Sequence, residues 1–236
     1  MISLPSGLVT CFARFSACTT TLGDDCMIRQ LLFLFLFSVC CPAAVSANSI
    51  LVIGDSLSAG YEMPVNHGWV SLLKDRMQQE GYEYEVVNAS ISGDTTSGAL
   101  ARIDTHINET NPVIAIVELG GNDGLRGLPL EAMYSNLSEI ISRLHGHDTH
   151  VLLIPIRIPP NYGQIYTNKF WEVYQRLAES HDLTLGRFLL DGIALNPELM
   201  MPDGIHPTAD AQPLVLDNVW SDLQPLLERL KENSGS

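Results

Sequence analysis

Three residues in the sequence have the types and spacing needed for nucleophilic acyl transfer. Ser56 follows an apolar run at residues 50–53, and Asp203 and His206 lie three residues apart nearer the C-terminus. A neutral serine hydroxyl is a weak nucleophile, so it needs a base within hydrogen-bonding reach, and His206 can be that base. Asp203 can accept a hydrogen bond from the imidazole and hold it in the required tautomer. Together these side chains can supply a nucleophile, a base and an orienting acid.

Two further segments can supply donors for the oxyanion that forms when an ester or thioester is attacked. Gly93 lies in the segment NASISGD and Asn122 in the segment GGND. The backbone N–H groups of Ser56 and Gly93 and the side-chain amide of Asn122 would give three donors. Loss of one such donor typically costs roughly 3–4 kcal/mol of transition-state stabilisation.

Each of these segments, taken singly, also fits an ordinary turn or helix cap. Gly93 can simply provide a positive φ angle. Ser56 does not lie in a G-x-S-x-G motif, because Ser58 stands where the second glycine would be, and this disfavours an α/β-hydrolase. The occurrence of all the segments at the predicted ends of strands favours a single shared site.

The elements that must position these residues follow from alternating apolar runs and helical stripes. Strands are predicted at Ile50–Ile53, Glu83–Val87, Val113–Leu119, Val151–Ile156 and Thr184–Phe188, and amphipathic helices follow with stripes beginning at Trp69, Ala99, Leu130, Phe170 and Val215. This alternation predicts an α/β fold: a three-layer, flavodoxin-like sandwich with helices on both faces of a five-stranded parallel sheet of order 2-1-3-4-5. Ligands of such sheets bind outside the carboxyl ends of the strands, where the polar segments fall.

The N-terminal segment has the pattern of a secretory signal. Residues 27–47 combine a cationic start, an apolar run of 11 residues and the small residues Val45-Ser46-Ala47. The apolar run is shorter than the roughly 20 residues needed to span a bilayer, although an uncleaved anchor is an alternative. We expect residues 1–26 to be an upstream segment added by a misplaced gene start. Residues 48–236 would then form a single periplasmic or secreted domain.

Cysteine content and charge exclude several classes of function. All five cysteines precede Ala47, so the mature chain would have no disulfide, no thiol nucleophile and no soft ligand for a structural zinc ion. The formal net charge of −14 argues against nucleic acid as a partner. It also argues against electrostatic docking onto anionic lipid, and no stable membrane insertion is expected.

Five motifs in chain order, GDSLSAGY, VVNASISGDT, VELGGNDGLRG, IRIPPNYG and DGIHP, resemble the SGNH, or GDSL, hydrolase superfamily. Within it, they are most similar to the group of periplasmic arylesterases, thioesterases and lysophospholipases. The resemblance implies Ser56 as nucleophile, Asp203 and His206 as the base pair, and Ser56, Gly93 and Asn122 as the oxyanion hole. It implies a monomer that uses no metal or cofactor and acts on small-molecule or lipid acyl esters and thioesters.

The resemblance also implies an acyl groove. Its lining residues would be Leu57, Leu125, Arg126, Ile156, Arg157, Ile158 and Pro159, with a mobile loop over residues 124–129. The residues alone equally allow Arg126 and Arg157 to be solvated surface arginines. Ile158 and Pro160 depart from the family pattern IRLPANYG, so the resemblance does not fix the preferred chain length.

Three alternatives remain open from the sequence. An acetylesterase acting on acetylated carbohydrate would use the same catalytic residues. A non-catalytic binding domain on the same scaffold would contain these residues but would not use them for catalysis. The segment His145–His150, with three histidines and an aspartate, has ligand types for a metal ion, but it falls in a helix-to-strand connection away from the predicted site.

Overall fold

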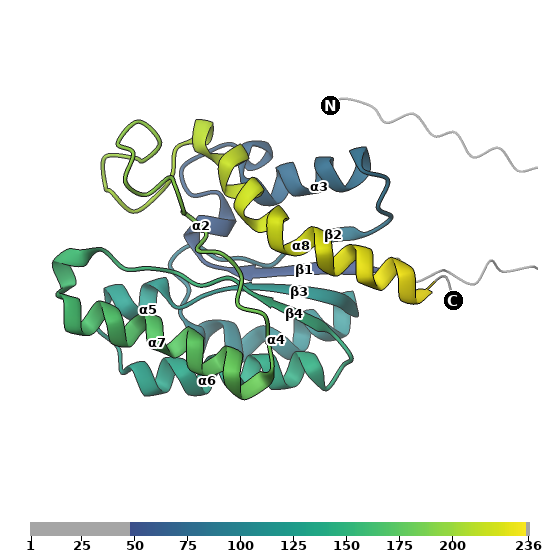
Figure 1. The fold of residues 1–236 in the computed structure, drawn as a ribbon, viewed down its shortest axis with the longest axis horizontal. Coiled ribbons are helices and arrows are strands. Elements are labelled where there is room, and N and C mark those ends of the chain that lie inside the picture. Colours follow the sequence, from purple (N-terminus) through teal and green to yellow (C-terminus); the bar gives the residue numbers. More distant parts are fainter. Residues whose placement is uncertain (1–47, 235–236) are drawn as a thin grey trace, which may run out of the picture. The chain divides into compact units, whose positions relative to one another are not determined.

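A central sheet of four parallel strands organises the protein. The computed structural model describes residues 48–234. The strands are β1 (Ser49–Gly54), β2 (Glu85–Asn88), β3 (Pro112–Glu118) and β4 (His150–Leu153), in the order β2-β1-β3-β4 (Figure 1). The expected upstream segment and signal sequence lie outside the described residues and stay predictions.

Helices cover both faces of this sheet, as the alternating pattern predicts. On one face lie α3 (Trp69–Gln79) and α8 (Gln212–Ser234), and on the other lie α4 (Thr96–Thr110), α6 (Leu130–His145) and α7 (Gln164–His181) (Figure 1). The short elements are the helices α2 (Ser56–Ala59) and α5 (Gly121–Leu125) and the 3₁₀ turns η1 (Val65–His67), η2 (Pro160–Tyr162) and η3 (Ala209–Ala211). The three-layer α/β prediction is therefore confirmed.

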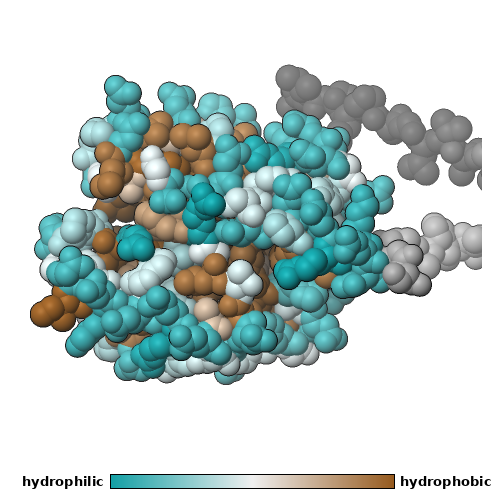
Figure 2. Space-filling view, viewed as in Figure 1, coloured by the Kyte–Doolittle hydropathy of each residue, from teal (hydrophilic) through white to brown (hydrophobic). Residues whose placement is uncertain are grey.

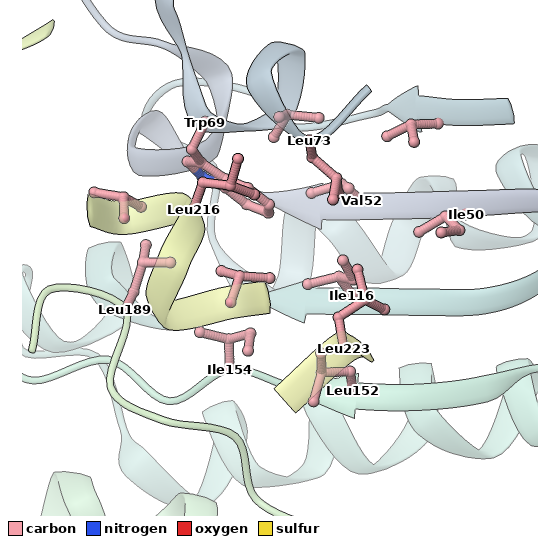
Figure 3. Packing of buried hydrophobic residues seen from close by; sticks show 14 of the residues in the cluster. Ile50, Val52, Trp69, Leu73, Ile116, Leu152, Ile154, Leu189, Leu216 and Leu223 are labelled. Atoms are coloured by element: carbon pink, nitrogen blue, oxygen red, sulfur yellow. The ribbon is translucent and has the colours of Figure 1, made fainter. Parts of the chain in front are cut away.

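The apolar run of β1 is buried on both sides. Ile50 and Val52 pack with Trp69 and the α3 and α8 side chains, as Figure 3 shows, whereas Leu51 and Ile53 pack with the α4, α6 and α7 side chains. Successive side chains of a strand point to opposite faces, so a strand covered on both faces needs an unbroken apolar run. The run before Ser56 therefore reflects the central position of β1 in the sheet.

The prediction of a fifth strand at Thr184–Phe188 is wrong. This segment reaches the edge of the sheet beyond β4 but makes only one isolated parallel bridge there, between Leu153 and Leu185. The Gly186 backbone N–H donates to the Leu153 carbonyl at 2.9 Å, but the next donor in this register would be residue 155, which is proline and has no N–H. The Arg187 N–H points to the other side of the segment and donates to the Asp222 carboxylate of α8 at 2.6 Å. The missing donor at Pro155 thus ends the pairing after one bridge.

The parallel arrangement gathers the polar segments at one edge of the sheet. The carboxyl end of β1 leads into α2, that of β2 into residues 89–95, and that of β3 into α5. The segment that carries Asp203 and His206 reaches the same edge before α8. No helix within residues 48–234 is long and apolar enough to cross a membrane.

Candidate active site

Ser56 is the first residue of α2, directly after the buried strand β1. The preceding residue, Asp55, caps this short helix by accepting a hydrogen bond from the Leu57 backbone N–H at 3.1 Å. Ser56 is partly exposed, and its Oγ lies 2.8 Å from Nε2 of His206. The cap fixes the turn that carries the hydroxyl, so its position follows from the end of β1.

Asp203 holds His206 through a tight turn. Its Oδ1 accepts hydrogen bonds from the backbone N–H groups of Ile205 at 2.9 Å and His206 at 3.0 Å. Its Oδ2 lies 2.6 Å from Nδ1 of His206. An ionised carboxylate only accepts hydrogen bonds, so Nδ1 carries a proton and Nε2 of the neutral imidazole is left as an acceptor for the Ser56 hydroxyl.

The ionised form of Asp203 is strongly favoured. Partial burial opposes ionisation, but it is outweighed by hydrogen bonds from the His206 side chain and from the backbone N–H groups of His206 and Ile205. The pKa of Asp203 is thereby lowered to about 2. This carboxylate consequently remains charged at neutral pH and keeps the imidazole in one tautomer.

Tyr61 covers the imidazole. Its ring stacks on that of His206 with centroids 4.2 Å apart and planes inclined by 26°. Sequence reasoning missed this residue, because an aromatic side chain in the irregular segment after α2 belongs to no periodic pattern. Its place at the end of GDSLSAGY is the one signal that could have pointed to it.

Gly93 lies in a loop that is tied down on both sides. It has a φ angle of +79°, which a side chain would disfavour, and its carbonyl accepts a hydrogen bond from Nη2 of Arg126 at 2.8 Å. On the other side, Arg102 donates to the Asp94 carboxylate at 2.6 Å and to the Ala89 carbonyl at 2.6 Å. The loop is therefore held in place by two arginines from different helical segments.

Three N–H groups of the predicted oxyanion hole remain able to donate a hydrogen bond. Within residues 48–234, neither the backbone N–H of Ser56 nor that of Gly93 has a hydrogen-bond partner. The Asn122 amide, on α5, donates one hydrogen bond, to Oδ2 of Asp55 at 3.1 Å. The loop of Gly93 meets the Ser56 turn through the Ile91 backbone N–H, which donates to the Gly54 carbonyl at 3.1 Å.

The predicted groove residues separate into buried and exposed groups. Leu57, Ile156 and Ile158 are buried, with Leu57 packed on the α3 and α8 side of the sheet and the two isoleucines on the opposite side. Leu125 and Pro159 are half-buried. The structure thus holds the three aliphatic residues within the core, and their contact with substrate stays a prediction.

The two predicted groove arginines differ in their surroundings. Both are exposed, but Arg126 contacts the Gly93 loop, whereas the guanidinium of Arg157 lies over the Trp171 ring, 4.0 Å from its centroid. Arg126 therefore supports the Gly93 loop, and Arg157 is turned onto α7.

A surface hollow of about 410 Å³ adjoins the Asp203–His206 turn. It is lined by Ala194, Leu195, Pro197, Met200, Met201, Pro202 and Gly204. Sequence reasoning did not identify it, because residues 189–202 form irregular turns that carry neither helical nor strand periodicity.

The histidine-rich connection lies at the amino end of β4, away from the edge that carries Ser56. Within residues 48–234, no group of three or more histidine, cysteine, aspartate or glutamate side chains gathers in a way that could hold a metal ion. The His145 ring instead lies near that of His181, with centroids 6.2 Å apart.

Comparison with known proteins places this arrangement in a family. The model of the GDSL-like Lipase/Acylhydrolase family matches residues 52–213. An arylesterase of Vibrio mimicus is 44% identical over 197 residues, covering 84% of this chain and 98% of the relative. The protein named thioesterase 1/protease 1/lysophospholipase L1 of Escherichia coli is 42% identical over 195 residues, covering 83% of this chain and 92% of that protein.

A solved structure agrees with the sequence relatives. The psychrotrophic esterase EstA from Pseudoalteromonas sp., in a structure inhibited by monoethylphosphonate, superposes with a TM-score of 0.74 at 38% identity, covering 77% of this chain and 99% of that one. Fold, sequence and the four polar segments agree, and the chain belongs to the GDSL-like lipase/acylhydrolase family.

Proposed function

We propose that the protein is an exported serine hydrolase that cleaves carboxylic esters and thioesters of acyl chains through an acyl-enzyme. The observation that carries this proposal is the continuous chain from Ser56 Oγ through the His206 imidazole to the Asp203 carboxylate, with contacts of 2.8 Å and 2.6 Å. The first contact is within the distance over which a proton passes between a nucleophile and its base, and the second holds the imidazole in the required tautomer. The names of the related esterases and thioesterases support the same reaction class.

In the acylation step, Nε2 of His206 takes the hydroxyl proton as Ser56 Oγ attacks the carbonyl carbon. Asp203 stays ionised and stabilises the imidazolium that forms. The oxyanion of the tetrahedral intermediate accepts hydrogen bonds from the Ser56 and Gly93 N–H groups and from the Asn122 amide. The imidazolium then returns its proton to the leaving alcohol or thiol, and the acyl group remains on Ser56.

Deacylation repeats the sequence with water as the nucleophile. The neutral His206 removes a proton from a water molecule, which attacks the acyl-enzyme carbonyl, and the same three donors bind the second oxyanion. The imidazolium protonates Ser56 Oγ as the carboxylic acid leaves. Each proton that His206 takes up is returned in the same half-reaction, so protons and charge balance.

Apolar surface at the catalytic edge supports an acyl-chain substrate. The structure exposes several large apolar side chains within residues 48–234. Each lies in a segment that follows the carboxyl end of a strand, or in residues 189–214, which lead into α8. Figure 2 shows apolar surface at this end of the molecule. These side chains are Val65, Ile91, Leu128, Tyr162, Ile165, Leu195 and Leu214. The connections at the opposite edge of the sheet expose none of this group. An acetyl group would leave most of this surface unused.

Replacing the proposed nucleophile, Ser56→Ala, should abolish hydrolysis of p-nitrophenyl esters while leaving the fold intact. Removal of a catalytic serine typically lowers kcat by far more than about 1,000-fold, because no other group can form the acyl-enzyme. Ser221→Ala, an exposed position on α8 whose hydroxyl bonds only to the carbonyl of Asn218, is the matched control and should leave kcat unchanged. Retention of more than a few per cent of activity in Ser56→Ala would contradict the proposal.

Acyl length separates this proposal from the acetylesterase alternative. We expect kcat/KM to be at least about tenfold higher for p-nitrophenyl octanoate than for the acetate, since each buried methylene contributes about 0.8 kcal/mol. Steady-state rates on both esters, with acetyl and octanoyl thioesters measured alongside, give the comparison. A strong preference for acetyl in both series would favour the carbohydrate acetylesterase instead.

Export rests on the signal pattern of residues 27–47, and we expect cleavage after Ala47. Enzyme expressed from Met27 in a Gram-negative host should appear in the periplasmic fraction with Asn48 as its first residue. N-terminal sequencing of that fraction measures this. A chain that retains residues 27–47, or that stays in the cytoplasm, would contradict export.

A further inference from the structure

Two carboxyl groups are buried behind the Ser56 turn. Asp55 is 3% exposed and Glu118, the last residue of β3, is fully buried. The ion pairs found within residues 48–234 involve neither of them. Burying acidic groups without a cation is costly, so their presence needs an explanation other than stability.

Asp55 connects the Ser56 turn with the Asn122 amide. One carboxylate oxygen accepts from the Leu57 N–H and the other accepts from Nδ2 of Asn122, each at 3.1 Å. A carboxylate offers no proton, so the side of the amide that faces it must be the nitrogen and not the oxygen. Nδ2 carries two protons, and the second remains available for another acceptor.

Glu118 holds the same turn through two hydrogen bonds. Its Oε2 accepts from the Ser58 hydroxyl at 2.6 Å and from the Asp55 backbone N–H at 3.4 Å. The close approach requires glycine at position 54, because a Cβ there would come within 2.6 Å of Oε2. Within the described residues, Oε1 has no hydrogen-bond partner. Glu118 therefore acts on the backbone that carries Asp55 and has no hydrogen bond to Asn122.

The ionised form of Asp55 opposes folding. Burial raises the pKa of Asp55 to about 6, and nearby Asp94 adds to this, whereas the Leu57 N–H, His206 and Asn122 partly offset it. Burial also raises the pKa of Glu118, with Asp55 contributing. A carboxyl group whose folded pKa exceeds its unfolded value gives stability at low pH that is lost as the pH rises through the folded pKa. At pH 8, the charge on Asp55 consequently lowers the free energy of unfolding.

We propose that the Asp55 carboxylate is a positioning residue that holds the Asn122 amide with its nitrogen, and not its oxygen, available to the reacting carbonyl, while Glu118 fixes the turn beneath it. This inference rests on the proposed function, which gives Asn122 an oxyanion to bind. Without an acceptor-only group at position 55, the amide can rotate and present its oxygen. That oxygen would repel the oxyanion.

The variant Asp55→Asn tests the inference, because it keeps an acceptor for the Leu57 N–H but presents an NH₂ group to Asn122. Because this NH₂ group can only donate, the Asn122 amide should turn its oxygen toward position 55, and its nitrogen would no longer face the oxyanion. We expect kcat and kcat/KM to fall together by about 100-fold or more, since one oxyanion donor is lost in the transition state. The matched control is Asp123→Asn, a buried carboxyl on the same helix that bonds Thr96 and not Asn122.

The decisive comparison repeats both substitutions in an Asn122→Ala background. If Asp55 acts through Asn122, Asp55→Asn should cost less than about threefold there, because the amide it positions is gone. Any cost of Asp123→Asn should be the same in both backgrounds. An equal loss for Asp55→Asn in both backgrounds would overturn the inference, because Asp55 would then act independently of Asn122.

A thermal unfolding measurement at pH 8 separates positioning from a structural role. Removing the buried charge should leave the midpoint of Asp55→Asn at or above that of the wild type, whereas a structural role predicts that the midpoint falls together with kcat. If Asp55→Asn does not fold, Asp55→Ser replaces it, since a serine hydroxyl still caps α2 but is too short to hold the Asn122 amide. Failure of the proposed function has a different signature: Asn122→Ala alone would leave kcat unchanged.

Discussion

The hydrogen bond between the Ser56 hydroxyl and the His206 imidazole is the contact on which the site depends. It joins residues 150 positions apart in the sequence, and both lie in short irregular or helical segments with little packing of their own. What brings them together is the sheet. β1 is central, between β2 and β3, and its run Ile50–Ile53 is fully buried. A close-packed core of this kind has few alternative arrangements, so the turn that leaves β1 has a defined position.

Periodicity predicted the elements that have a strong apolar pattern and failed where a missing backbone donor in a neighbouring segment decided the outcome. The strands β1 to β4 and the helices α3, α4, α6, α7 and α8 all follow runs or stripes that a core requires. The segment Thr184–Phe188 contains Leu185 and Phe188, but the chain beside it has Pro155 where a backbone N–H is needed to extend the pairing. Periodicity within one segment carries no information about the backbone donors of the segment beside it.

The site was predictable in its chemistry and less so in its support. Ser56, Asp203 and His206 follow from what acyl transfer needs, and the structure brings them into contact. Glu118 could have been suspected, because it is the only charged residue in the apolar run of β3. Tyr61 carries no comparable signal, since the ring on which it stacks, that of His206, lies far away in the sequence.

The polar residues behind Ser56 show where catalysis and stability conflict. Asp55, Ser58 and Glu118 occupy buried positions that apolar side chains would fill more favourably. Sites that break the rule of an apolar core are commonly functional, and the fold must offset their cost elsewhere. Here the offset comes from the two extensive apolar layers on either face of the sheet.

A crystal structure of the protein after reaction with a p-nitrophenyl phosphonate ester tests the central claim most directly. Such an adduct mimics the tetrahedral intermediate. We expect phosphorus bound to Ser56 Oγ, with one phosphonyl oxygen about 2.7–3.1 Å from the Ser56 N–H, the Gly93 N–H and the Asn122 amide nitrogen. Phosphorus bound to another residue, or a phosphonyl oxygen that contacts none of these three donors, would contradict the claim.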